Sequence, residues 1–341
     1  MTINVFAAGG ALPSRFSRRH LAGVVPFLAL AARTALAATI EPNAASSAPA
    51  TAAPGRAVVV RSVVNMFSRS SLDTDVVSQA ICSTTVATLR TSDRWTQIRT
   101  PDDYTGWVVD SALRALDADE QYPAAPSSNS PAAASDRSSI AASVAQVESL
   151  AAHIYREPDV TKHAPLITVP FDVRLEVLKD DPNNVRWIEV RLPDQHKAWI
   201  QRGDVSLAPS GAPRLWTIPE LIALSQRFLG RPYTWGGASS FGYDCSGFTQ
   251  MLCRRGGVLI PRDADVQAAW SGMTKLERTA LEPGDLLFFG EKASHITHTG
   301  FYLGDGRFIH STVHGTPVIQ ISRLEEAPWT TLLVACRRWR H

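Results

Sequence analysis

An internal repeat constrains the first two thirds of the chain. Residues 95–102 (WTQIRTPD) return 92 positions later as residues 187–194 (WIEVRLPD). In each copy a second tryptophan follows twelve positions after the first, at Trp107 and Trp199. A period of this length is too long for a solenoid repeat and is typical of duplicated domains. The 341 residues leave room for a further domain behind the pair.

Short runs of apolar and β-branched residues surround both copies and predict strands. In the first copy these runs cover 58–64, 76–77, 86–89, 95–98 and 107–109, with a turn over 102–106. We therefore expect two small all-β barrels, over residues 57–117 and 140–210. Residues 39–56 and 118–139 are rich in alanine, serine and proline, so we interpret them as flexible linkers.

The first residues have the pattern of an export signal over 1–38. Arg15, Arg18 and Arg19 precede the apolar run 21–32, and residues 35–37 (ALA) form a small-residue cleavage pattern. We expect an exported protein, periplasmic or extracellular, with no stable membrane span after signal removal. Whether the signal is of the Sec or the twin-arginine type stays open. A net charge of +2 suggests no nucleic-acid partner.

The last part of the chain, residues 211–341, has helices first and strands afterwards. Helical patterns cover 218–229, the segment from 245 onward, and 264–270. Strands are predicted over 285–289, 299–303, 308–311, 318–321 and 332–337. This order predicts an α+β domain in which helices pack on an antiparallel sheet.

A cysteine stands at the start of the second predicted helix. Asp244 is suited to be its N-cap, and Gly256 with Gly257 provides a stop. The Cys245 sulfur then lies in the first turn, at the positive end of the helix dipole. This position favours the thiolate, which is the nucleophilic form of cysteine.

A base for this nucleophile is available in residues 298–310 (HTGFYLGDGRFIH), which predict a hairpin. A three-residue loop over 304–306 places His310 opposite Gly300 and on the same face as His298. A two-residue loop would place the two histidines on opposite faces. Cys245, His298 and His310 therefore form a possible nucleophile, base and orienting residue.

A metal site is the rival interpretation, because His295, His298, His310 and His314 lie close together in the sequence. The chain lacks an HExxH motif and paired-cysteine spacing, so we expect neither metal nor cofactor. Catalytic use of Cys245 leaves Cys82, Cys253 and Cys336, among which at most one disulfide can form. We expect Cys253 in the core, and whether it meets Cys336 stays open.

Six ordered motifs resemble the NlpC-type cell-wall peptidases, which are papain-like cysteine peptidases of bacterial peptidoglycan. They are residues 233–237 (YTWGG), 244–248 (DCSGF), 261–263 (PRD), 283–289 (PGDLLFF), 298–304 (HTGFYLG) and 309–310 (IH). The resemblance implies Cys245 as nucleophile, His298 as general base and His310 as the polar third member. It also implies that the fold of this domain is that of a papain-like peptidase.

The same resemblance implies residues that bind the substrate. Tyr233 is expected beside the nucleophile, and Asp244 and Ser246 along the substrate groove. Asp263 is expected to meet a substrate amine, although Ala264 stands where relatives acting on short muropeptides usually carry serine.

The two predicted barrels resemble bacterial SH3-like domains, which flank the peptidase in this family and bind or frame peptidoglycan. In relatives with this layout the first such domain closes one end of the groove, which limits the substrate to a free N-terminal L-Ala. The resemblance makes Asp75 and Tyr104 candidates for contacting the substrate from outside the catalytic domain.

The expected function is a cysteine endopeptidase of peptidoglycan stem peptides. The resemblance implies cleavage between γ-D-glutamate and a diamino acid, meso-diaminopimelate or lysine, with free muropeptides as the favoured substrates. The alternatives are a D,L-endopeptidase that remodels intact wall, a non-catalytic wall-binding protein, and an acyl transferase or amidase on the same fold.

Overall fold

The computed structural model describes residues 55–123, 144–208 except 182, and 214–340. The predicted export signal over 1–38 lies outside the described residues, as do 39–54 of the first predicted linker and 124–139 of the second. Within the described ranges, no helix combines the length and the apolar character that a membrane crossing requires.

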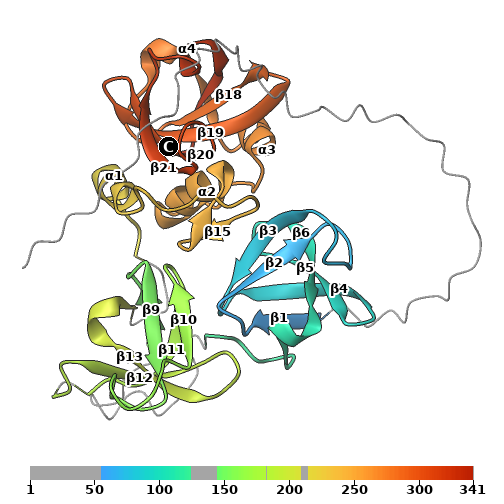
Figure 1. The fold of residues 1–341 in the computed structure, drawn as a ribbon, viewed down its shortest axis with the longest axis vertical. Coiled ribbons are helices and arrows are strands. Elements are labelled where there is room, and N and C mark those ends of the chain that lie inside the picture. The colour runs from blue at the N-terminus through green and yellow to red at the C-terminus, as the bar shows by residue number, and fades with distance from the viewer. Residues whose placement is uncertain (1–54, 124–143, 182, 209–213, 341) are drawn as a thin grey trace, which may run out of the picture. The chain divides into compact units, whose positions relative to one another are not determined.

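The first copy of the repeat forms a small antiparallel barrel. Its strands are β1 (Gly55–Val59), β2 (Val63–Phe67), β3 (Val76–Ile81), β4 (Thr85–Ser92), β5 (Trp95–Arg99), β6 (Thr105–Val109) and β7 (Leu113–Leu116), in the order β3-β2-β6-β5-β4-β1-β7 (Figure 1). Alternating residues point inward, so Met66, Ile98 and Val108 are fully buried in its core. The single run predicted over 58–64 is wrong in one respect, because the chain turns between Val59 and Val63 and forms two strands.

The second copy has the same topology strand for strand. Its strands are β8 (Val144–Val147), β9 (Ala151–Tyr155), β10 (Ile167–Pro170), β11 (Arg174–Lys179), β12 (Trp187–Arg191), β13 (Lys197–Gln201) and β14 (Val205–Ala208), in the order β10-β9-β13-β12-β11-β8-β14. The paired tryptophans Trp95 and Trp187 begin β5 and β12. A short 3-10 turn, 110–112 in the first copy and 202–204 in the second, precedes the last strand of each. The expected duplication of a small barrel is confirmed.

The C-terminal domain is α+β, as expected. Its helices are α1 (Ile218–Gln226), α2 (Cys245–Arg255), α3 (Ala264–Ala269) and α4 (Trp329–Leu332). Its strands are β15 (Ala238–Ser239), β16 (Gly242–Tyr243), β17 (Thr274–Leu276), β18 (Leu286–Lys292), β19 (His295–Gly304), β20 (Arg307–Thr312), β21 (Val318–Arg323) and β22 (Leu333–Arg338). The main sheet has the order β17-β22-β18-β19-β20-β21, and α2 packs on β19 and β20 (Figure 1). The sequence analysis did not anticipate β15, β16, β17 and α4.

Both faces of this sheet are covered by apolar side chains. One face packs against α2, where Phe248 and Leu252 join a fully buried cluster that includes Cys253. The other face packs against Trp329 and includes Cys336. Since Cys253 and Cys336 belong to these separate clusters, they do not pair, and all four cysteines, each within the described residues, are free thiols.

Candidate active site

The nucleophile helix α2 begins at Cys245, and its first turn is fixed by the residue before it. The Asp244 carboxylate caps the helix by accepting a hydrogen bond from the Gly247 backbone amide at 2.7 Å. Gly247 lies against the loop that leads into the helix, because a Cβ atom there would be 2.2 Å from the carbonyl oxygen of Gly237. Only glycine allows this approach, so loop and helix start are held together.

Arg262 is the buried residue that holds this loop. Its guanidinium binds the Asp244 carboxylate through two nitrogens, at 3.0 and 2.6 Å, and donates to the Ser246 hydroxyl at 2.9 Å. It also donates to the Gly237 carbonyl at 3.3 Å and, from Nε, to the Ser78 hydroxyl of the first barrel at 3.0 Å. All five N–H donors of the arginine are therefore used. In the sequence, Arg262 is marked only as the neighbour of Asp263 in the motif 261–263.

The Cys245 thiol is only 9% exposed, and this burial decides its protonation. Burial, followed by the charge of Asp244, raises the pKa of the Cys245 thiol to about 12. The backbone amides of Thr299 and Ser246 and the guanidinium of Arg262 act in the opposite direction but do not outweigh burial. The helix start favours the thiolate, as expected, but burial outweighs it and favours the protonated thiol in this state.

Tyr233 is held in its loop by backbone bridges. Pro232 pairs with Val318, and Tyr233 pairs with Tyr243. Burial raises the pKa of the Tyr233 hydroxyl, and the charge of a Cys245 thiolate would raise it further. Contact of Tyr233 with a substrate bound at Cys245 stays a prediction.

The two histidines lie side by side on the hairpin formed by β19 and β20. Gly304 pairs with Arg307, so the turn itself is one residue shorter than predicted. A bulge between Tyr302 and Gly304 shifts the register, and Phe301 then pairs with Ile309 and Tyr302 with Phe308, as predicted for the three-residue loop. The Nε2 atom of His298 is 2.7 Å from Nδ1 of His310. Nε2 of His310 is in turn 3.0 Å from the Ser322 hydroxyl on β21. The sequence analysis missed Ser322, which only the pairing of β20 with β21 brings to this position.

This hydrogen-bonded chain determines which nitrogen of His298 can act as a base. With Nε2 bonded to His310, Nδ1 is the atom left to exchange a proton with Cys245. A neutral His298 whose Nδ1 is free carries its proton on Nε2, and it donates that proton to His310. His310 then carries its own proton on Nε2 and donates to Ser322. The chain therefore orients both rings, and donation in the direction from His298 to Ser322 leaves Nδ1 of His298 unprotonated.

The sulfur and the base are neighbours through β19. Thr299, the residue after His298, donates its backbone amide to the Cys245 sulfur. Within the part of the chain that the structure describes, no hydrogen bond joins Cys245 Sγ directly to His298.

Trp329 covers the two imidazoles. Its ring centroid is 5.4 Å from that of His298, 4.8 Å from that of His310 and 5.4 Å from that of His314. Burial, with a smaller effect of the His314 charge, lowers the pKa of His298 to about 3, and burial lowers the pKa of His310 well below its ordinary value. Both rings are thus neutral, as a general base requires.

The rival metal interpretation finds no support in the geometry. Nδ1 of His310 is hydrogen-bonded to His298, and its other ring nitrogen faces a hydroxyl. Among the described residues, no three histidine, cysteine or acidic side chains are grouped so that they could hold a metal ion.

Tyr104 and Asp263 meet, although they come from different domains. The Tyr104 hydroxyl of the first barrel donates to Asp263 Oδ1 at 3.3 Å. A pocket of about 420 Å³ beside the pair is lined by residues of both domains, among them Asp102, Arg262 and Trp270. Burial raises the pKa of Asp263, and the charge of Arg262 and the Tyr104 hydroxyl partly offset this effect.

The remaining predicted substrate residues differ in their surroundings. Asp244 and Ser246 are buried and bonded to Arg262, so in this state they hold the loop. Asp75 is exposed in the turn before β3, and its backbone carbonyl accepts from Ser68 at 2.9 Å. Its side chain contacts neither Tyr104 nor Asp263 in the described structure. Contact of these three residues with a substrate stays a prediction.

Comparison with known proteins agrees with this geometry. Residues 230–338 match the model of the NlpC/P60 family, and residues 62–113 match that of the bacterial SH3 domain. The chain resembles a γ-D-glutamyl-L-lysine dipeptidyl-peptidase of Bacillus cereus, with 37% identity over 157 residues, or 44% of each protein. It resembles an enzyme of the same name from Bacillus subtilis with 41% identity over 124 residues, or 36% of this chain and 41% of that one.

A solved structure extends the likeness to the fold. The crystal structure of an NlpC/P60 family protein from Bacillus cereus superposes with a TM-score of 0.67 at 22% identity, over 83% of this chain and 99% of that one. The sequence matches span less than half the length of the two curated relatives. The matched ranges nevertheless include Cys245, His298 and His310 on one side and Tyr104 on the other. The chain therefore carries a cysteine-peptidase domain of the NlpC/P60 family behind a bacterial SH3 domain.

Proposed function

We propose that this protein is a cysteine peptidase that hydrolyses the bond between γ-D-glutamate and the following diamino acid in peptidoglycan stem peptides. The proposed substrates are free muropeptides that begin with L-Ala. The names of the two relatives, which are γ-D-glutamyl-L-lysine dipeptidyl-peptidases, support the bond and the release of a dipeptide. The first residues of the chain support export, to the periplasm or the cell exterior.

The observation that carries the substrate class is the meeting of Tyr104 with Asp263. A carboxylate held 3.3 Å from a tyrosine hydroxyl of another domain suits an ammonium group better than a continuing chain. Asp263 directly follows Arg262, which binds the residues on both sides of Cys245. A peptide amine bound to Asp263 is therefore anchored a short distance from the nucleophile, which favours release of a short N-terminal fragment.

The arrangement supports a two-step reaction. His298 Nδ1 takes the thiol proton as Cys245 Sγ attacks the γ-carbonyl carbon of D-glutamate. The imidazolium then returns the proton to the leaving amine of the diamino acid, which leaves a thioester on Cys245. A water molecule, deprotonated by His298, attacks the thioester, and the proton returns to the sulfur as the dipeptide departs. The Nε2–His310–Ser322 chain holds the ring throughout.

The start of α2 can stabilise the negative oxygen that forms in each step. The Gly247 amide already donates to the Asp244 side chain, and the Phe248 amide to the Asp244 carbonyl. The amide of Ser246 faces the sulfur, and that of Cys245 itself has no hydrogen-bond acceptor among the described residues. These two amides are the donors left for an oxyanion at the positive end of the helix.

The experiment compares free peptides with intact wall. The mature protein and Cys245→Ala are incubated with L-Ala-γ-D-Glu-L-Lys, with its diaminopimelate counterpart, with the N-acetylated form of each, and with sacculi, and products are identified by mass spectrometry. We expect L-Ala-D-Glu from the free peptides only, and none from Cys245→Ala. Equal cleavage of acetylated peptides or of sacculi would make the protein a wall-remodelling endopeptidase, and binding without cleavage would make it a wall-binding protein.

A further inference from the structure

The second barrel contributes a turn to the interior of the catalytic domain. This turn, between β10 and β11, carries Phe171, which is buried, and Asp172, whose side chain is 8% exposed. The Phe171 ring belongs to the apolar cluster under α2 and contacts Phe228 edge to face, with centroids 5.6 Å apart. Phe228 in turn contacts Tyr243 and Phe248, at 5.7 and 5.8 Å, which flank the nucleophile in the sequence. A continuous set of aromatic contacts thus connects the second barrel to the start of α2.

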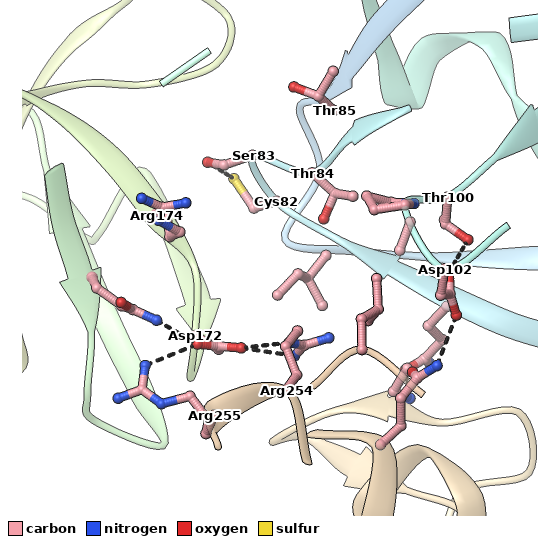
Figure 2. A pocket seen from close by; sticks show the side chains of 18 of the residues that line it. Cys82, Ser83, Thr84, Thr85, Thr100, Asp102, Asp172, Arg174, Arg254 and Arg255 are labelled. Carbon is pink, nitrogen blue, oxygen red and sulfur yellow. Dashed lines mark hydrogen bonds and ion pairs between the residues drawn. The ribbon is translucent and has the colours of Figure 1, made fainter. Parts of the chain in front are cut away.

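Asp172 binds the other end of the same helix. Its Oδ2 accepts from Arg254 at 2.7 Å, and its Oδ1 accepts from Arg255 at 3.0 Å, as Figure 2 shows. Gln146 donates a further hydrogen bond to Oδ1 at 2.6 Å. Arg255, which is 2% exposed, also binds Glu148 of the second barrel at 2.8 Å. Both arginines belong to the last turn of α2, where positive charge is already favoured by the helix dipole.

The backbone at Asp172 is left-handed, and the two barrels share this feature while differing in the side chains of the turn. Its φ is +75°, a value that asparagine and aspartate tolerate better than most residues. The equivalent turn of the first barrel has Ser83 at φ +70°, and the Ser83 hydroxyl donates to its own neighbour Cys82. Both turns line the same pocket of about 380 Å³ (Figure 2). One turn of a duplicated barrel has therefore acquired a ring and a carboxylate that reach the catalytic helix.

We propose that Phe171 and Asp172 of the second barrel are positioning residues for Cys245. The Phe171 ring lies 5.1 Å from the Arg255 guanidinium in the last turn of α2 and reaches Phe248 in the first turns through Phe228. The Asp172 carboxylate binds the last turn, so both residues oppose a shift of the helix relative to the sheet. Reactivity depends steeply on such placement, since a displacement of about 1 Å can cost roughly 100-fold in rate. Only the kinetic test of this proposal depends on the proposed peptidase function.

The test uses Asp172→Asn in the full mature protein, because asparagine keeps the backbone geometry and removes the charge. We expect kcat on L-Ala-γ-D-Glu-L-Lys to fall about tenfold with KM within about twofold of the unmutated value. Because a loosened helix exposes the sulfur, alkylation of Cys245 by iodoacetamide at neutral pH should become about threefold faster. Cys253, fully buried in the same helix, should stay protected, which separates a shifted helix from an unfolded one.

Two matched variants serve as controls. Asp285→Asn removes another buried carboxylate that binds two arginines, Arg338 at 2.9 Å and Arg340 at 3.2 Å, away from α2. Phe171→Leu is compared with Tyr155→Leu, whose ring contacts Trp187 at 5.6 Å inside the second barrel. The inference is overturned if Asp172→Asn and Asp285→Asn behave alike, or if Phe171→Leu leaves both kcat and Cys245 alkylation unchanged. If the unmutated protein cleaves nothing, the proposed function fails, and the alkylation rates still decide the positioning role.

Discussion

Replacing Arg262 by lysine tests whether the charge or the shape of this residue holds the nucleophile loop. Arginine uses all five of its donors here, whereas the lysine ammonium has three. Arg262→Lys therefore makes at least two fewer hydrogen bonds. A hydrogen bond contributes about 1–3 kcal/mol, with bonds of charged groups at the upper end, so the expected loss of stability is about 2–6 kcal/mol, although the charge is kept. For a domain of this size the melting midpoint should fall by roughly 5–20 °C.

The buried thiol of Cys253 provides an assay that reports on the catalytic domain alone. In a Cys245→Ala background, a thiol reagent modifies Cys253 only when the domain opens, and the temperature at which this occurs gives the midpoint. Arg307→Lys is the control, because Arg307 is exposed and pairs with Asp305 at 3.6 Å, so its replacement should change stability by less than about 0.5 kcal/mol. Equal midpoints for the two lysine variants would refute the argument from the guanidinium's shape.

Three further outcomes follow from the site. Burial raises the pKa of Cys245 to about 12 and lowers that of His298 to about 3, so we expect neither thiolate nor imidazolium at neutral pH. The unmutated protein and Cys245→Ala should then show equal ultraviolet absorbance from thiolate. Activity should persist below the ordinary imidazole pKa, until His298 gains its proton. Ser322→Ala removes the acceptor of His310 Nε2. The loss of one hydrogen bond, about 0.5–1.5 kcal/mol, should lower kcat by about 2- to 12-fold and leave KM unchanged. A change confined to KM would contradict the orienting role. Gly236 and Gly230 both have a positive φ, +70° and +78°, but an added Cβ would be 2.9 Å from Val76 at Gly236 and in open space at Gly230. Gly236→Ala should therefore lower the melting midpoint more than Gly230→Ala. Equal losses would mean that backbone strain alone is responsible.

The repeat and the hairpin could be predicted because each depends on local pattern. The tryptophan spacing gave the duplication, and alternation around the Gly304–Gly306 loop gave the register that brings His298 and His310 together. The helix at Cys245 followed from its cap and its glycine stop. These features depend on residues that are close in the sequence.

What the sequence did not reveal depends on contacts between distant segments. Ser322 reaches His310 only because β21 pairs with β20, and Trp329 covers the imidazoles from a helix that no periodicity indicates. The protonation of Cys245 was misjudged because the helix dipole is local, whereas burial is produced by the whole fold. The bonds from Asp172 to α2 likewise join residues more than eighty positions apart.

The bond from Arg262 to Ser78 has a consequence for how such proteins can be recombined. The loop before the nucleophile is completed by a hydroxyl from the first barrel, and Gln79 of the same strand accepts from the Ala238 amide. Asp102 of that barrel also accepts from Gln250 on α2. A chimera that joins this peptidase domain to an unrelated N-terminal domain would keep the reacting groups but would lose their hydrogen bonds with the first barrel. These hydrogen bonds belong to the junction between the two domains, and they would be transferred only when both sides of the junction are exchanged together.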